Sequence, residues 1–256
     1  MHSVDELRAI VEEALEELDL WHELHGQAES VRYSLAVGGK RIRPVISLAV
    51  GEALGAPLEQ VLPAALAIEL VHTFSLVHDD LPAMDDDEER RGHPSTWKKF
   101  GEGVGILAGD ALQAEAFRLA ASYERSDAAR ELAEATLGMI GGQYLDTMVE
   151  GYPLDAVHRL KTGCLFFASV TMALWAAGLS AEEQGPWRAF AQELGLLFQI
   201  VDDILDDDGY VTEHGEEGAR RYADEAAERA RERLAEVDAD TSVLRELVDS
   251  LAVRTA

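Results

Sequence analysis

An acidic run from Asp79 to Arg91 is the part of the sequence best suited to chemistry. It contains seven carboxylate side chains, follows a long apolar stretch, and ends in the adjacent arginines Arg90 and Arg91. Crowded carboxylates raise one another's pKa unless positive charge is held nearby. Mg²⁺ is a suitable counter-charge, because this hard cation binds through one or two carboxylates together with substrate phosphates. A solvated acidic loop is the alternative interpretation of the run taken alone.

A second acidic cluster, Asp202, Asp203 and Asp206, follows another apolar stretch. Residues four apart on a helix differ by about 40° around its axis, so Asp202 and Asp206 share a face. In the first cluster Asp79 and Asp85 would differ by about 240° on a straight helix. Pro82, which lies between them, favours a break that would bring Asp85 back towards a metal ion. Two acidic helix ends therefore predict one metal cluster between facing helices.

Positive side chains gather in the segment that follows Gly38 and Gly39. It reads Lys40-Arg41-Ile42-Arg43-Pro44, and the proline fits the first turn of a helix running to about Leu54. Free backbone N–H groups and the helix dipole favour an anion at such a start. A simple corner between two helices would also explain the glycines.

Two further residues, His72 and Lys161, are placed to take part in the same metal and anion binding. His72 lies seven residues before Asp79, about 20° away around the predicted helix. The chain has four lysines, and one of them, Lys161, lies in an apolar helix expected over 154–179, where it must find an anion or reach water. Carboxylates that bind metal, together with cations over an apolar cavity, fit a substrate with a phosphate head and a hydrocarbon tail.

The elements that must position these residues read as helices throughout. Alanine, leucine and glutamate are abundant and prolines number only seven, so we predict an all-α fold forming one domain over residues 1–256. The expected helices include 58–80, 184–207, 216–235 and 242–253, with a kink in the 154–179 helix at Gly163. No strand pattern is visible.

Composition excludes several classes of protein. The net charge of −27 argues against nucleic acid and against anionic membrane surfaces as partners. The longest apolar run, 165–179, is shorter than the roughly 20 residues that a membrane span needs, so we expect no stable membrane insertion. The N-terminus is acidic and has no signal-peptide pattern, and the single cysteine, Cys164, fits a reducing compartment. We therefore expect a cytoplasmic protein.

Several motifs in this order resemble the trans-isoprenyl diphosphate synthases, or polyprenyl synthetases, over residues 27–207. The matching stretches are Gly38–Pro44, His72–Asp85, Arg90–Gly92, Leu107–Leu112, Gly142–Asp146, Lys161–Gly163 and Phe198–Asp206. The resemblance implies a helical barrel or bundle around a deep central apolar cavity, a homodimer, and three Mg²⁺ ions. It also implies condensation of isopentenyl diphosphate with an allylic diphosphate of five or ten carbons.

Roles for individual residues follow from this resemblance alone. The implied metal ligands are Asp79, Asp80, Asp85, Asp202 and Asp206. The allylic diphosphate would be bound with Arg90 and Lys161, and isopentenyl diphosphate by Lys40, Arg43, His72 and Arg91. Thr162 and Gln199 would lie beside the developing allylic cation.

Product length is implied at Phe74, five residues before the first aspartate. An aromatic residue there, with two extra residues between Asp80 and Asp85, resembles bacterial farnesyl diphosphate synthases and implies a C15 product. The sequence departs from the family after Asp206, where a glycine–lysine loop is usual and this chain has no lysine. Alternatives are a geranylgeranyl (C20) diphosphate synthase, a class I terpene cyclase, and a non-catalytic partner subunit of a heteromeric synthase.

Overall fold

The chain folds into a bundle of helices, as the sequence predicts, in a computed structural model that describes residues 1–149 and 151–253. Residue 150 and the last three residues, which the single-domain prediction includes, lie outside the described part. The α-helices described are α1 (Val4–Glu16), α2 (Gln27–Ala36), α3 (Ile42–Ala53), α4 (Leu58–Asp79), α5 (Thr96–Phe100), α6 (Glu102–Ala120), α7 (Asp127–Met148), α8 (Leu154–His158), α9 (Cys164–Ala176), α10 (Gly185–Asp206), α11 (Tyr210–Ala235) and α12 (Ser242–Ala252). A short 3₁₀ turn, η1 (His22–Leu24), and a π-helical turn, η2 (Arg159–Gly163), complete the helical elements.

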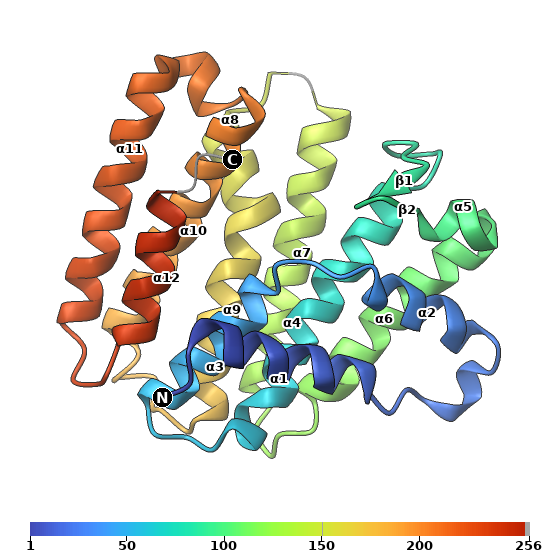
Figure 1. Ribbon diagram of the computed structural model, residues 1–256, viewed down its shortest axis with the longest axis horizontal. Coiled ribbons are helices and arrows are strands. Elements are labelled where there is room, and N and C mark those ends of the chain that lie inside the picture. The colour runs from blue at the N-terminus through green and yellow to red at the C-terminus, as the bar shows by residue number, and fades with distance from the viewer. Residues whose placement is uncertain (150, 254–256) are drawn as a thin grey trace.

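Two helices that are apolar on every side form the centre of the bundle. Helix α9 packs against α3, α4, α7 and α10, and α4 packs against α3, α6 and α9 (Figure 1). Such helices are buried all round, which is why their sequences lack the one-sided pattern of a surface helix. By length and composition α4 could also span a membrane, but 67% of its most apolar window is buried inside the described protein.

Three sequence expectations about the elements need correction. The helix expected at 216–235 begins earlier, at Tyr210, and bends at Gly215, whose φ of 71° is not helical. The kink expected at Gly163 is real but takes the form of the π-helical turn η2, which separates α8 from α9. Glu89–Arg90 and His93–Pro94 form a two-stranded antiparallel ribbon, β1 and β2, although no strand pattern was evident in the sequence.

Candidate active site

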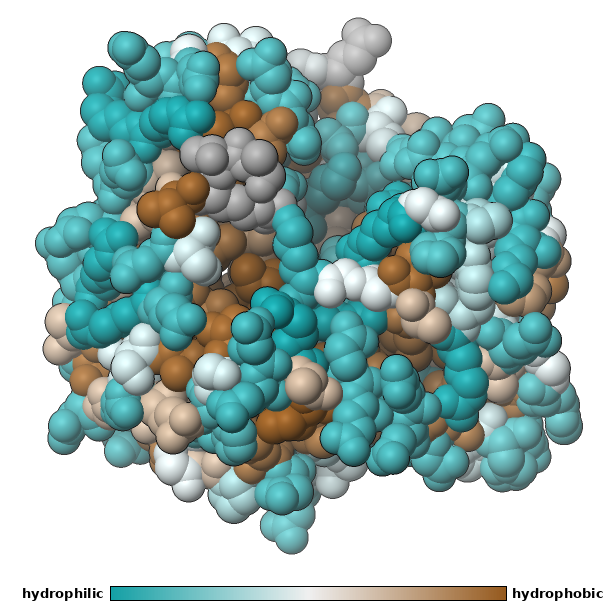
Figure 2. All heavy atoms as spheres, in the orientation of Figure 1, coloured by the Kyte–Doolittle hydropathy of each residue, from teal (hydrophilic) through white to brown (hydrophobic). Residues whose placement is uncertain are grey.

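A cavity of about 1050 Å³ opens between the ends of α3, α4, α7, η2 and α10. Figure 2 shows the surface hollowed at the upper edge of the molecule, in the region beside the β1–β2 ribbon. Predicted site residues in its lining come from α3, α4, η2 and α10, from the segment before α3 and from the residue after β1: Lys40, Arg43, His72, Phe74, Asp79, Arg91, Lys161, Thr162 and Asp202. The structure therefore brings together nine residues that the sequence spreads over more than 160 positions.

The first acidic cluster lies where α4 ends. After Asp79 the chain turns sharply, and the backbone N–H of Asp85 donates to the carbonyl oxygen of Asp79 at 2.9 Å. This turn, which contains Pro82, returns Asp85 towards Asp79 as the sequence predicted. Burial raises the pKa of Asp79 to about 6, with the Lys161 ammonium opposing the shift and the Asp85 carboxylate adding to it. A cation placed near Asp79 would relieve this unfavourable charge.

Asp80 points away from the open cavity and is only 2% exposed. The Arg90 guanidinium donates to both carboxylate oxygens of Asp80, from Nε at 2.8 and 3.0 Å and from Nη2 to Oδ1. Because Arg90 belongs to β1, this two-pronged contact fastens the ribbon to the end of α4. Arg90 itself lies outside the described lining of the main cavity.

The second acidic cluster ends α10 on the opposite side of the cavity. Asp202 lines the cavity and Asp206 is exposed to solvent. Burial raises the pKa of Asp202, the repulsion from Asp206 raises it further, and the Arg43 guanidinium opposes both. Asp203 is 6% exposed and accepts hydrogen bonds from Gln199 Nε2 at 2.6 Å and the Tyr210 backbone N–H at 2.9 Å.

The positive residues near Gly39 divide into two groups. Lys40, Arg41 and Arg43 all border the cavity, but Arg41 has a left-handed backbone (φ 48°) and its side chain is buried against acidic partners inside the protein. There Arg41 bonds Glu69 at 2.6 Å and Glu12 at 2.9 Å, so its charge is balanced internally. The predicted anion site therefore retains two of its three cations.

Arg43 is held in an apolar setting beside the second acidic cluster. It is 9% exposed, and its guanidinium carbon lies 4.3 Å from the centre of the Phe166 ring. Burial lowers the pKa of Arg43 to about 10. The stacked ring keeps this charged group in place without neutralising it, because a cation is attracted to the face of an aromatic ring.

The imidazole of His72 lies among the arginines of the site. Burial lowers the pKa of His72 well below its usual value, and Arg43 and Arg91 lower it further. His72 is consequently neutral at neutral pH and can both donate and accept a hydrogen bond.

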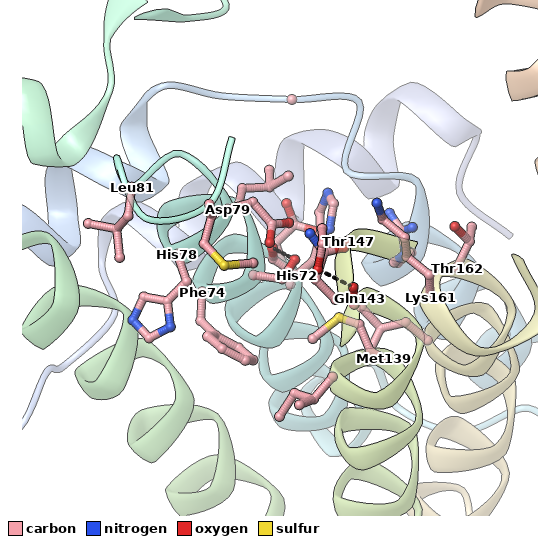
Figure 3. A pocket seen from close by; sticks show the side chains of 18 of the residues that line it. His72, Phe74, His78, Asp79, Leu81, Met139, Gln143, Thr147, Lys161 and Thr162 are labelled. Atoms are coloured by element: carbon pink, nitrogen blue, oxygen red, sulfur yellow. Dashed lines mark hydrogen bonds between the residues drawn. The ribbon is translucent and has the colours of Figure 1, made fainter. Parts of the chain in front are cut away.

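The π-helical turn η2 carries Lys161 and Thr162 into the cavity. Gly142 on α7 makes this possible, because a Cβ at that position would lie 2.3 Å from the backbone nitrogen of Lys161. The Lys161 ammonium bonds Asp146 on α7 at 2.5 Å. Figure 3 shows Lys161 and Thr162 approaching the cavity from the side opposite the helix that carries Asp79.

An apolar end of the cavity is formed by Phe74, Ile106, Met139 and Ile140. Phe74 lies there although helical spacing places it about 140° from Asp79. The cavity extends around α4, so residues on two faces of that helix line it. In Figure 3 the ring of Phe74 lies below Asp79 and faces the side of α7 that carries Met139.

A model of the polyprenyl synthetase family matches residues 26–219 of the chain. The chain belongs to the polyprenyl synthetase family. It is 40% identical to the farnesyl diphosphate synthase of Escherichia coli (strain K12) over 264 aligned positions, which cover 88% of each protein. It is 42% identical to the geranylgeranyl diphosphate synthase of Cyanophora paradoxa over 193 positions, 70% of this chain and 64% of that protein's length.

Solved structures of this kind have the same fold. A geranyltransferase from Legionella pneumophila superposes with a TM-score of 0.89 and 31% identity, covering 97% of this chain and 95% of its own. The helical bundle around a central cavity, predicted from the resemblance, is therefore confirmed.

The donors in this polyprenyl synthetase fit the implied Mg²⁺ ions. Within residues 1–149 and 151–253, no three His, Cys, Asp or Glu side chains are close enough to hold an ion by themselves. Mg²⁺ commonly combines one or two carboxylates with water and substrate phosphates. Asp79 and Asp202 face the cavity and offer such oxygens from opposite sides, and burial raises the pKa of each carboxyl group.

The other predicted residues are not part of the lining of this cavity. Asp85 and Asp206 are exposed beside it, and Asp80 is committed to Arg90. Gln199 lines a second cavity of about 640 Å³ between α7, α9 and α10. Its Nε2 is bonded to Asp203, and its Oε1 has no hydrogen-bond partner among the described residues. In this conformation Gln199 does not lie where the developing cation was expected.

The connection after Asp206 contains only residues 207–209 before α11 begins. The arginines that could replace the usual lysines are engaged elsewhere, since Arg220 bonds Glu216 at 2.9 Å and Arg221 lies 4.0 Å from Glu225. The chain therefore lacks the usual lysines after Asp206, and Arg220 and Arg221 are paired with glutamates and do not take their place.

Sequence reasoning missed a row of residues on α7 that lines the cavity. Gln143 and Thr147 are four residues apart on one helix face, and Tyr144 and Met148 lie next to them. Gln143, Tyr144 and Asp146, the partner of Lys161, fall in the Gly142–Asp146 stretch of the family resemblance, which assigns them no role. The four-residue spacing that relates these pairs was the available signal.

Proposed function

We propose that this protein is a prenyltransferase that joins isopentenyl diphosphate head-to-tail to an allylic diphosphate of five or ten carbons. The supporting observation is one cavity with opposed acidic helix ends, separate sets of cations and an apolar end. A phosphate-rich head and a hydrocarbon tail need these two environments side by side. The proposed product is the all-trans C15 compound farnesyl diphosphate.

The diphosphate of the allylic substrate would lie between the two acidic clusters. Asp79 and Asp202, with Asp85 and Asp206 beside them, would hold three Mg²⁺ ions on that group. When bound, Mg²⁺ would neutralise the diphosphate and stabilise it as a leaving group. Lys161 faces this space and would donate directly to phosphate oxygens.

Isopentenyl diphosphate would bind across the start of α3. Lys40, Arg43 and Arg91 line that side of the cavity, and neutral His72 lies among them. Arg91 donates to the carbonyl oxygen of Gly38, which orients its guanidinium beside the turn that precedes α3. Two diphosphate sites then face each other across the cavity.

The reaction separates charge inside an apolar space. The allylic C–O bond breaks, the alkene of isopentenyl diphosphate forms the new C–C bond, and a proton passes to an oxygen of the departed diphosphate. The Thr162 hydroxyl lines the cavity near Lys161 and can place an oxygen dipole towards the cation. The apolar lining excludes water that would otherwise capture it.

A homodimer is proposed from one exposed surface. Ile106, Leu107, Leu137, Ile140, Tyr144 and Met148 on α6 and α7 are 46–70% exposed. An exposed group of large apolar side chains commonly marks an interaction site. Four of them, Ile106, Ile140, Tyr144 and Met148, also line the cavity, so a second copy would close its side. We also propose that the enzyme is cytoplasmic and binds neither nucleic acid nor membranes, in line with its net charge of −27.

One incubation tests the proposal. The purified protein is given Mg²⁺, labelled isopentenyl diphosphate and, separately, C5, C10 or C15 allylic diphosphate, and products are sized by chromatography. The expected product is C15 from the two shorter substrates. Extension of the C15 substrate to C20 would instead establish a geranylgeranyl diphosphate synthase.

Two other outcomes would contradict the proposal. Cyclic hydrocarbon formed from the allylic substrate alone would indicate a terpene cyclase. Absence of any elongation would favour a partner subunit, in keeping with the missing lysines after Asp206.

A further inference from the structure

His78 lies between α4 and α6 at the apolar end of the cavity. It follows Phe74 by one helical turn, and the two rings meet edge to face, with centroids 5.5 Å apart and planes at 89°. Nε2 of His78 lies 3.0 Å from the carbonyl oxygen of Ile106 on α6. Figure 3 shows the two rings next to each other on α4, with His78 on the side towards α6. The imidazole therefore links Phe74 to the neighbouring helix.

The position of this ring depends on a glycine of α6. A Cβ at Gly109 would lie 2.1 Å from Nε2 and 2.3 Å from Cδ2 of His78. Real Cβ atoms do not approach other atoms so closely, so any larger residue at 109 would displace the ring. A Cβ at Gly103, on the same helix, would have no atom within 4 Å. The α4–α6 contact thus contains a notch that is specific to His78.

The ring of Phe74 borders the cavity at the edge of the hydrophobic core, with His78 beside it. Phe74 is 5% exposed and, with His78 and Ile106, lines the apolar end. A phenylalanine with an empty space beside it can rotate about two side-chain bonds, and the hydrocarbon of a growing product would press on it. The imidazole lies against the Phe74 ring on the side towards α6, and its removal would leave space there.

We propose that His78, seated in the Gly109 notch, is a positioning residue that fixes the Phe74 ring and thereby sets the length of the product. The proposal rests on the proposed function, because product length has meaning only for an elongating enzyme. His78 acts through the shape and the position of its ring against Phe74.

The main test compares products of variants that are supplied with isopentenyl diphosphate, C10 allylic diphosphate and Mg²⁺. We expect His78→Ala to raise the C20:C15 product ratio at least fivefold, in the same direction as Phe74→Ala. His78→Phe retains a ring edge against Phe74 and should keep the ratio within twofold of the unaltered protein. His93→Ala, which removes an exposed histidine outside the cavity, is the matched control and should change nothing.

A second pair of variants tests the notch. Gly109→Ala should raise the C20:C15 ratio because it expels the imidazole, whereas Gly103→Ala should not. In a His78→Ala background the Gly109→Ala change should have no further effect, since the clash has been removed. An unchanged ratio in folded His78→Ala and Gly109→Ala proteins would overturn the inference, while the unaltered protein's elongation would leave the proposed function standing.

A measurement that needs no turnover tests the positioning of Phe74 by His78 separately from the proposed function. With 4-fluorophenylalanine placed at position 74, the ¹⁹F spectrum should show one sharp line in the unaltered protein and a broadened or divided line after Gly109→Ala or His78→Ala. If either variant folds and its ¹⁹F line is the same as that of the unaltered protein, Phe74 is not held by His78. If the unaltered protein elongates nothing, the claim about product length fails together with the proposed function. If His78→Ala does not fold, Gly109→Ala decides both measurements.

Discussion

The two acidic clusters distribute their aspartates alike but stabilise them differently. In each cluster one aspartate faces the cavity, the next is buried, and an exposed aspartate follows: Asp79, Asp80 and Asp85 in the first, and Asp202, Asp203 and Asp206 in the second. The buried member in each case organises the chain that follows its helix. The spacing of a motif therefore does not by itself show which carboxylates are free to bind a ligand.

The difference lies in the partner of the buried aspartate. Asp80 is balanced by a full positive charge, the Arg90 guanidinium, at 2.8 Å. Asp203 is held by uncharged donors, the Gln199 amide and the Tyr210 N–H, and His158 Nδ1 lies 3.5 Å away. Burial raises the pKa of Asp203 against the effect of those hydrogen bonds. The buried aspartate of the first cluster is thus held by an ion pair. That of the second is held by hydrogen bonds from Gln199 and from the first residue of α11.

The largest expected effect is on turnover. It would show that the cavity-facing aspartates of the two clusters, Asp79 and Asp202, are equally necessary. We expect Asp79→Ala and Asp202→Ala each to reduce turnover by about 10³-fold or more, because each removes charge that stabilises the leaving group through its metal ion. Circular dichroism and melting temperature should show an intact fold. Turnover near that of the unaltered protein in either variant would refute the metal assignment.

A smaller effect, on the free energy of unfolding, should distinguish the two buried aspartates, Asp80 and Asp203. Asp80→Asn leaves the partly buried Arg90 without its carboxylate and should lower the free energy of unfolding by about 2 kcal/mol. Asp203→Asn keeps an oxygen for the Tyr210 N–H, and its new amide can donate to the unpaired Oε1 of a reoriented Gln199, so the loss should stay below about 1 kcal/mol. Urea denaturation measures both. Equal losses would mean that the two buried positions are alike after all.

The smallest effect concerns the pH dependence of the ligand-free protein. The pKa of Asp79 is raised from 3.8 to about 6, so the folded state keeps a proton that the unfolded state releases between these values. The stability that this provides is present below pH 3.8 and is lost as the pH rises through 6. Asp79→Asn should therefore be more stable than the unaltered protein at pH 7.5, by about 1 kcal/mol after screening by water, and equal to it at pH 3.8. Thermal unfolding at both pH values without Mg²⁺ checks this, and a gap that widened at low pH would contradict it.

Much of this arrangement could be predicted from the sequence because it depends on local rules. Long apolar stretches located α4 and α10, and Pro82 predicted the turn that brings Asp85 back to Asp79. Phe74 could not be found from spacing, since its place depends on how the cavity extends around α4. The resemblance to a known family was needed to identify it.

What could not be predicted depends on distant partners. Arg41 belongs to the same positive segment as Lys40, yet it turns inward because Glu12 and Glu69 lie there in the folded chain. The orientation of Gln199 likewise depends on Asp203 and on the early start of α11. The β1–β2 ribbon is held to α4 by the contact of Arg90 with Asp80, a contact that no strand propensity would indicate.

The wide turn η2 means that the path from His158 to Cys164 holds one residue more than an ordinary helix of that rise would contain. Excising a single residue there would let α8 and α9 merge into one straight rod. Without the widened turn, Lys161 would no longer be carried towards Asp146, and the cavity would lose the ammonium group that faces Asp79.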